Sequence, residues 1–344
     1  MSNGRPQPTM KRRYELIPQM KAYEEMRVVW VPHLMNLYQP NFRSPVCNTD
    51  EYGFRYTLQG SKELSYADFQ NQQGPKGLLC GGSTAFGTGA TGDSHTITSN
   101  LNRDSDMTWF NFGGMGQNST QELMRYILFG PKVDQVVLFT GVNNLMIHTL
   151  SAYFSQVYGA FFSQTVFELL NRVSTNPQYV KHLMGRAKGR VIDALWRLVP
   201  GQSDEPTLDN LPDFEIRYNQ SLNILGRDLD VWAALSEKSG FSLRFMLQPI
   251  LTWMPKNLSP EEEELLDIMD QGGWRRWGGQ IRALNDSYTR YREDTRRICE
   301  ERGILWSDFN ELLPREGWLF CDRTHLTDKG QEIAAEIIAS ECKN

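Results

Sequence analysis

Five short runs of apolar residues recur along the chain, and they are centred near residues 78, 108, 135, 243 and 304. Runs of this length without polar alternation are typical of strands that are buried on both faces of a parallel sheet. Between them lie longer segments with apolar positions at helical spacing, such as Phe214 to Ser239. This order predicts an α/β fold in which helices cover both faces of a five-stranded parallel sheet.

The position of these runs divides the chain of 344 residues into two parts, the second of which contains a long insertion. Residues 1–75 precede the first core strand, and we interpret them as an extension packed beside the core, with a short helix from Glu15 to about Arg27 and a strand at Val28–Val31. Residues 76–344 form the main domain. The connection at about 145–211 is unusually long for a link between strands, so we expect a helical insertion there.

Helix signals continue in the second half of the chain. Ser259 is followed by Pro260 and by glutamates at 261–264. A cap, a proline in the first turn and acids at the positive end of the helix dipole explain this run better than a metal site does. Further helices are expected from Trp274 to about Arg302 and from Thr327 to Cys342.

The composition of the chain indicates which kinds of partner and which cellular compartment to expect. The 36 Lys and Arg against 41 Asp and Glu argue against nucleic acid, because nucleic-acid-binding domains are usually basic. No run of 18 apolar residues is present, so no membrane span is expected. The polar N-terminus does not resemble a signal peptide, and five cysteines without close pairs suit a reducing compartment. We therefore expect a cytoplasmic protein.

The insertion offers two candidate surfaces. Leu145–Arg172 carries several aromatic residues at helical spacing, which favours an amphipathic helix packed on the sheet. Lys181–Leu198 mixes basic and apolar residues, so it is either a solvated basic helix face or a surface for peripheral contact with anionic lipid. Because the insertion follows Asn143 at a strand end, we interpret it as a lid or a substrate-selecting element.

The first core strand leads into a glycine turn that carries a serine. Leu78–Cys80 is followed by Gly81, Gly82 and Ser83. A serine just past the carboxyl end of a buried strand lies where open α/β sheets bind their ligands. The alternative is a Gly-Ser turn without chemistry. The glycines of residues 87–92 have the spacing of neither a P-loop nor a dinucleotide turn.

A base and a carboxylate for this serine lie near the C-terminus. Asp322 and His325 are three residues apart, just before a helix whose cap is Thr327 or Asp328. A serine hydroxyl becomes a good nucleophile when a base takes its proton and a carboxylate orients that base. Of the five histidines, only His325 has an acidic residue so placed in a turn. Taken alone, the pair could also cap a helix or bind a metal.

Two more strand ends complete the pattern, because Met107–Gly116 and Asp134–Asn144 each run from an apolar strand into a glycine turn. Together with Ser83 and the Asp322/His325 pair, this set resembles the SGNH (GDSL-like) hydrolase family, whose four sequence blocks occur here in the same order. The resemblance implies a flavodoxin-like three-layer α/β/α fold and a serine-dependent ester hydrolase without a metal or cofactor.

The resemblance also implies a role for each matching residue. Ser83 corresponds to the nucleophile, and Asp322 and His325 complete a catalytic triad. The N–H groups of Ser83 and Gly116 and the side-chain amide of Asn143 correspond to an oxyanion hole. An acyl-enzyme on Ser83 would be the intermediate of the reaction.

This chain departs from the family pattern at two positions, where Gly82 and Asn144 replace aspartates. Neither position carries the essential chemistry of the family. The stretch Gly81–Gly87, together with Asp50–Arg55 upstream, resembles a bacterial subgroup associated with glycans and envelopes. The expected substrate is therefore an ester of a glycan or of another small molecule.

Other interpretations of the same residues remain open. An O-acyltransferase would use the same triad but deliver the acyl group to an alcohol. A binding protein could keep the fold without catalysis, although no triad or oxyanion residue is missing. The α/β-hydrolase fold is disfavoured, because it needs several strands before its nucleophile and Ser83 follows the first core strand.

Overall fold

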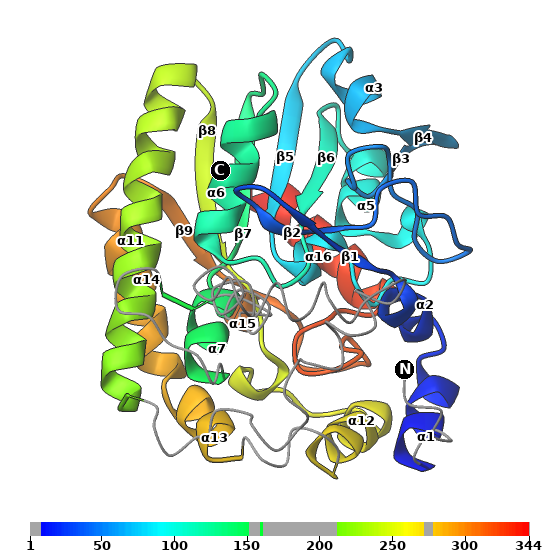
Figure 1. Ribbon diagram of the computed structural model, residues 1–344, viewed down its shortest axis with the longest axis vertical. Coiled ribbons are helices and arrows are strands. Elements are labelled where there is room, and N and C mark those ends of the chain that lie inside the picture. Colours follow the sequence, from blue (N-terminus) through cyan, green and yellow to red (C-terminus); the bar gives the residue numbers. More distant parts are fainter. Residues whose placement is uncertain (1–7, 151–158, 161–211, 272–277, 344) are drawn as a thin grey trace, which may run out of the picture.

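The computed structural model describes residues 8–150, 159–160, 212–271 and 278–343. Its centre is a five-stranded parallel sheet in the order β6-β5-β7-β8-β9 (Figure 1). The strands are β5 (Lys76–Gly81), β6 (Thr108–Gly113), β7 (Gln135–Thr140), β8 (Ser242–Leu247) and β9 (Leu305–Asp308). Counted from the first core strand, the order is 2-1-3-4-5, which is the flavodoxin-like order. The predicted α/β fold with a five-stranded parallel sheet is confirmed.

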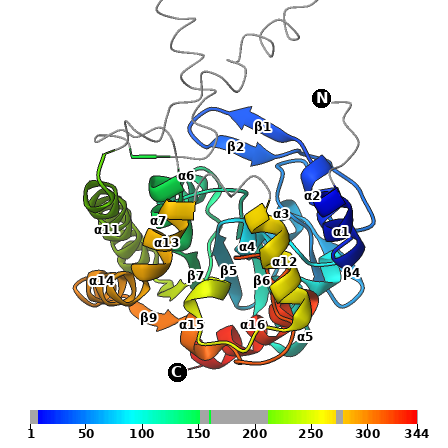
Figure 2. The same ribbon diagram turned by 90° about the horizontal axis from the view of Figure 1, so that it is seen from below.

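Helices cover both faces of this sheet (Figure 2). On one face lie α6 (Ser119–Phe129), α7 (Val142–Leu150), α11 (Phe214–Ser239) and α14 (Tyr288–Glu300). On the other face lie α5 (Ile97–Asp104), α15 (Phe309–Leu312) and α16 (Asp328–Glu341). Strand side chains alternate between the two faces, so Leu78 and Cys80 belong to the first core and Leu79 to the second.

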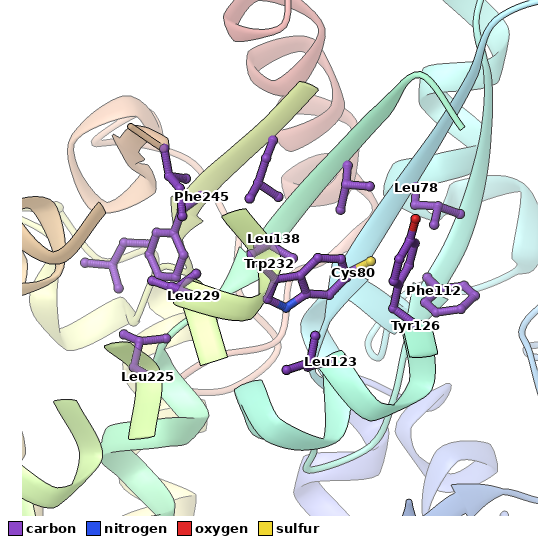
Figure 3. Close-up of a cluster of buried hydrophobic side chains, with 14 of the residues drawn as sticks. Leu78, Cys80, Phe112, Leu123, Tyr126, Leu138, Leu225, Leu229, Trp232 and Phe245 are labelled. Carbon is purple, nitrogen blue, oxygen red and sulfur yellow. The ribbon is translucent and has the colours of Figure 1, made fainter. Parts of the chain in front are cut away.

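The core under α6 and α11 is the larger of the two (Figure 3). Trp232 of α11 packs against Tyr126 of α6, with 4.8 Å between their ring centroids, and both lie over the strand residues Leu78 and Leu138. Each fully buried aliphatic or aromatic side chain contributes about 1.5–3 kcal/mol. This packing explains why α11 spans 26 residues, as the sequence pattern predicted.

The N-terminal part forms a separate set of small elements beside the sheet. These are α1 (Pro8–Leu16), α2 (Met20–Glu25), β1 (Val28–Val31), β2 (Met35–Tyr38), β3 (Thr57–Gln59), β4 (Lys62–Leu64) and α3 (Tyr66–Gln70). The strands pair as two antiparallel hairpins outside the main sheet. Phe54 and Phe69 nevertheless join the core under α6. The boundary near residue 75 stays a prediction.

Two helix predictions were wrong in their extent. The helix expected from Glu15 to Arg27 covers only the end of α1 and the whole of α2. Pro18, which lacks a backbone N–H, lies in the break between them. The helix expected from Trp274 to Arg302 is α13 (Gly278–Asp286) and α14, separated at Ser287. Residues 274–277 lie outside the described residues.

The remaining elements border the carboxyl edge of the sheet or connect to it. They are α4 (Ser83–Phe86), α12 (Pro260–Gln271) and the 3-10 helices η1 (Asp93–His95) and η3 (Leu251–Trp253). Most of the expected insertion, residues 151–158 and 161–211, lies outside the described residues, so its role as a lid stays a prediction. Of the helices in the described ranges, none is long and apolar enough to cross a membrane.

Candidate active site

Ser83 is the first residue of α4 and follows β5 after a turn of two glycines. Gly81 has a φ of 154°, and a Cβ at this position would overlap the carbonyl oxygen of Phe139 on β7. The N–H of Phe86 donates to the carbonyl of Gly82 at 3.0 Å, which starts α4. The N–H of Ser83 therefore lies at the start of the helix, where no intrahelical acceptor exists.

A chain of hydrogen bonds links Ser83, His325 and Asp322. Ser83 Oγ lies 2.8 Å from His325 Nε2, and His325 Nδ1 lies 2.7 Å from Asp322 Oδ2. The other carboxylate oxygen, Oδ1, accepts the N–H groups of Thr324 and His325, both at 2.9 Å. The structure thus brings together the three residues that the sequence assigned to a catalytic triad.

The charge state of Asp322 decides which nitrogen of His325 carries the proton. Burial acts to raise the pKa of Asp322, but the attraction of His325 and the hydrogen bonds to the carboxylate outweigh it and hold the pKa well below its usual value. The ionised carboxylate accepts a hydrogen from Nδ1, so Nε2 of a neutral His325 accepts the hydroxyl hydrogen of Ser83.

The loop that carries His325 is fixed by its own backbone. Phe320 and Leu326 form an antiparallel bridge, and the N–H of Cys321 donates to the carbonyl of His325 at 2.7 Å. From the serine side, Thr84 Oγ1 donates to the carbonyl of Thr324 at 3.0 Å. The residue after Ser83 therefore holds the residue before His325, which fixes the distance between nucleophile and base.

Asn143 lies beside the serine turn and binds the residue that follows Gly116. Asn143 Nδ2 donates to the carbonyl of Gln117 at 2.7 Å, and a Cβ on Gly82 would lie less than 3.0 Å from the same Nδ2. An amide nitrogen carries two hydrogens, so donation to Gln117 leaves the other for a further acceptor. Ser83, Gly116, Asn143 and His325 are partly exposed, whereas Gly82 and Gln117 beside them are buried.

The two departures from the family pattern both have a local explanation. Gly82 leaves the space that the Asn143 amide occupies. Asn144 holds Ser119, the first residue of α6: its Oδ1 accepts the N–H of Ser119 at 3.0 Å, and its Nδ2 donates to Ser119 Oγ at 2.7 Å. Because Ser119 Oγ itself donates to Asp228 at 2.6 Å, it needs a donor at position 144, which an ionised aspartate lacks.

Arg55, which sequence reasoning did not single out, supports the far end of the serine helix. The side chain is fully buried, and Nη1 donates to the carbonyls of Phe86 at 3.3 Å and Gly87 at 2.8 Å. Its Nε donates to Asp93 at 2.7 Å. These carbonyls end α4, so a residue from the N-terminal part holds the helix that carries Ser83. Only the resemblance of Asp50–Arg55 to a bacterial subgroup pointed to this region.

Glu262 supports the other side of the site, although it lies in the run assigned to the helix dipole. Its Oε1 accepts the N–H groups of Leu319 at 2.9 Å and Phe320 at 3.1 Å, just before the loop of Asp322. Its Oε2 lies 2.6 Å from Nζ of Lys256. Its place three residues after Ser259 marks Glu262 as the acidic residue of a capping box, and the N–H of Ser259 donates to its Oε2 at 3.0 Å. The contact with Leu319 and Phe320 could not be predicted, because it joins a side chain to the backbone of a distant part of the chain.

Within the described ranges, no group of three or more His, Cys, Asp or Glu side chains is arranged to hold a metal ion. The five cysteines are unpaired, and all but Cys342 are buried.

Comparison with known proteins gives likenesses in structure only. No family model matches the sequence, and no curated protein matches it. Solved structures that resemble this one include a lipolytic protein, esterases and a lipase. One is a lipolytic protein of the G-D-S-L family from Desulfitobacterium hafniense, at 12% identity and a TM-score of 0.43, covering 78% of this chain and 99% of that one.

Two other similar structures are enzymes from different bacteria. The extracellular lipase of Streptomyces rimosus matches at 12% identity and a TM-score of 0.42, over 78% of this chain and 100% of that one. An acetylxylan esterase from Geobacillus stearothermophilus matches at 14% identity and a TM-score of 0.41, over 79% of this chain and 95% of that one. With TM-scores below 0.5, these likenesses do not bear on the activity of this chain.

Proposed function

We propose that this chain is a serine-dependent ester hydrolase of the SGNH type. The observation that carries the proposal is the hydrogen-bonded chain of Ser83 Oγ, His325 and Asp322 at the carboxyl edge of the sheet. A buried carboxylate, a histidine and a partly exposed serine in this order form the arrangement that activates a serine for acyl transfer.

In the proposed mechanism, His325 Nε2 takes the proton of Ser83 as Oγ attacks the acyl carbon. Asp322 stabilises the imidazolium that forms. The oxyanion accepts hydrogen bonds from the N–H groups of Ser83 and Gly116 and from the amide of Asn143, and each such donor is worth about 3 kcal/mol. His325 then protonates the leaving alcohol. A water that His325 deprotonates attacks the acyl-enzyme, and His325 returns this proton to Ser83 Oγ as the carboxylic acid leaves.

The proposed substrate is an acyl ester of a glycan or a small metabolite. This part of the proposal depends on the resemblance of Gly81–Gly87 and Asp50–Arg55 to a subgroup of SGNH hydrolases. An alcohol in place of water as the acceptor would make the same site an O-acyltransferase.

Labelling with a fluorophosphonate tests the nucleophile directly. We expect one adduct, located by mass spectrometry on Ser83 in the full chain and absent from Ser83→Ala. The same preparation should release acetate from an activated acetyl ester, and product analysis with added alcohols separates hydrolysis from acyl transfer. An adduct on another residue, or a folded protein that turns over no ester, would overturn the proposal.

A further inference from the structure

Asn36 lies on β2 of the first N-terminal hairpin, outside the main sheet, yet its side chain is almost completely buried, with 1% exposure. Its Nδ2 donates to the carbonyl of Met115 at 3.1 Å, and its Oδ1 accepts Nε2 of Gln121 at 2.8 Å. The amide therefore binds the backbone beside Gly116 with its nitrogen and a side chain of α6 with its oxygen.

The orientation of this amide follows from its partners. Gln121 uses its Oε1 to accept the N–H of Asn118 at the start of α6, so its Nε2 is the end that faces the hairpin. Nε2 of Gln121 also donates to the carbonyl of Leu34 at 2.9 Å. A donor needs an acceptor opposite it, so Asn36 presents Oδ1 to Gln121 and Nδ2 to the carbonyl of Met115.

The carbonyl of Met115 and the N–H of Gly116 belong to one peptide unit. In a trans peptide, these two groups point in opposite directions from the same plane. A hydrogen bond to the carbonyl therefore fixes the direction of the N–H. It also polarises the peptide, which strengthens the N–H as a donor.

The peptide between Met115 and Gly116 needs an external restraint, because Gly116 restricts it little. This glycine has a φ of 57°, in the left-handed region that glycine enters without cost, so glycine itself does little to restrain this peptide. We propose that Asn36 is a positioning residue of the oxyanion hole, which holds the Met115–Gly116 peptide so that the Gly116 N–H faces the reacting carbonyl. This inference rests on the proposed function.

A second contact ties the same hairpin to the other donor. Nε2 of Gln117 donates to the backbone carbonyl of Asn36 at 3.2 Å, and the carbonyl of Gln117 accepts Nδ2 of Asn143 at 2.7 Å. Residue 36 thus contacts the residues on both sides of Gly116. A segment far upstream in the sequence therefore holds the backbone before and after Gly116.

The hairpin reaches this position at a cost in backbone strain. His33 and Met35, on either side of Leu34, have φ angles of 68° and 71°. Residues other than glycine in this region cost on the order of 1 kcal/mol each. The strained turn directs the carbonyl of Leu34 to Gln121 and places Asn36 over Met115.

The test is Asn36→Asp, which keeps the size and the acceptor but removes the donor to Met115. We expect kcat on an activated acetyl ester to fall about 10- to 100-fold with KM little changed, which is less than the loss of a whole oxyanion donor. The control is Asn102→Asp on α5, whose amide donates to the carbonyls of Leu58 and of Trp109 near the amino end of β6. Its kcat should stay near that of the wild type.

A spectroscopic readout follows the peptide itself. In protein labelled with 13C-carbonyl methionine and 15N-glycine, a carbonyl-to-nitrogen NMR correlation is seen only where a methionine directly precedes a glycine. Such pairs occur at residues 115–116 and 184–185. Met184→Leu identifies the second pair. The Gly116 signal should move in Asn36→Asp and stay in place in Asn102→Asp. Asn36→Ser, which is neutral and too short to reach Met115, replaces the aspartate variant if that variant does not fold.

The outcomes separate the two proposals. An unmoved Gly116 signal, or a loss of kcat equal to that of Asn102→Asp, overturns the role of Asn36. If the wild type hydrolyses no ester, the proposed function fails, and with it the oxyanion role of Asn36. The Gly116 signal then decides separately whether Asn36 holds the peptide.

Discussion

Gly82 and Asn143 are packed so closely that a Cβ on residue 82 would overlap Nδ2 of the Asn143 side chain. The φ of Gly82 is −79°, which lies outside the left-handed region that favours glycine. The atom that would have to move is the far end of a side chain, which can rotate away. Residue 82 therefore controls the position of a proposed oxyanion donor without controlling the fold.

We expect Gly82→Ala to separate stability from activity. The variant should unfold within a few degrees of the wild type, while kcat on an activated ester falls about 100- to 1,000-fold because the Asn143 amide is displaced. Thermal unfolding and steady-state kinetics measure the two effects. Gly92→Ala is the control, since the nearest atom to its Cβ would be 3.6 Å away. A stable and fully active Gly82→Ala would show that Asn143 does not stabilise an oxyanion.

The triad variants should rank by role. Ser83→Ala removes the covalent route and His325→Ala removes the base, so each should nearly abolish turnover. Asp322→Ala should lose less, although still a large factor, because the carboxylate fixes the tautomer and stabilises the imidazolium. The Ser83/His325 double variant should be little worse than either single one, because the two residues act as a unit.

Kinetics on an activated acetyl ester measure this ranking, with folding checked by circular dichroism. Near-normal turnover by a folded His325→Ala would require a different base. The proposed role of the Asp322/His325 pair would then be wrong.

Much of the fold could be predicted from the sequence, because the five core strands are mostly apolar, although Asn111 interrupts β6 and Arg244 interrupts β8. The helix breaks could not. Around Ser287, the apolar spacing of α13 and α14 continues without interruption, and the break is stabilised locally by Ser287 Oγ, which donates to the carbonyl of Leu284. A serine hydroxyl that binds a helix carbonyl does not change the spacing of the apolar residues. The break could therefore not be predicted from the hydrophobic pattern.

Some residues of the candidate site could likewise be predicted from the sequence, and others could not. Ser83, Asp322 and His325 could be chosen from the sequence, because nucleophilic catalysis restricts the residue types and the strand ends restrict their positions. Arg55, Glu262 and Asn36 could not be chosen, because each acts on backbone groups of a distant segment. Every residue has a backbone N–H or carbonyl, so a side chain that binds a backbone group does not require a particular residue type as its partner. The sequence therefore contains no pair of residues that would reveal the contact.

Glu262 should be far more sensitive to substitution than its neighbours in the same helix. Both its side chain and that of Lys256 are fully buried, so Glu262→Gln leaves a buried ammonium without its charged partner. Breaking a buried pair in this way costs about 3–5 kcal/mol. Glu263→Gln, exposed on the next position of α12, should stay within about 0.5 kcal/mol of the wild type. Urea unfolding measures both, and equal effects would mean that the pair does not stabilise the fold.

Glu122 should make the stability of the protein depend on pH. Its side chain is fully buried on α6, where Oε1 accepts the hydroxyl of Thr140 at 2.7 Å and Oε2 has no hydrogen-bond partner among the described residues. Burial raises the pKa of Glu122 to about 8, against the opposing effect of the Thr140 hydrogen bond and with a smaller contribution from Asp228. The folded protein therefore keeps this proton up to about pH 8, whereas the unfolded chain releases it near pH 4.5.

Between these two values, the unfolded state binds fewer protons than the folded state, so the free energy of unfolding falls as pH rises. Glu122→Gln has no proton to release, and its stability relative to the wild type should therefore increase from pH 5 to pH 8, by on the order of 1 kcal/mol per pH unit. Urea unfolding at pH 5, 6.5 and 8 measures the difference, with Glu263→Gln as the control that should show no such trend. A difference in stability that stays constant over this range would contradict the prediction. It would mean that Glu122 is already ionised in the folded protein at pH 5 and that another group stabilises its charge.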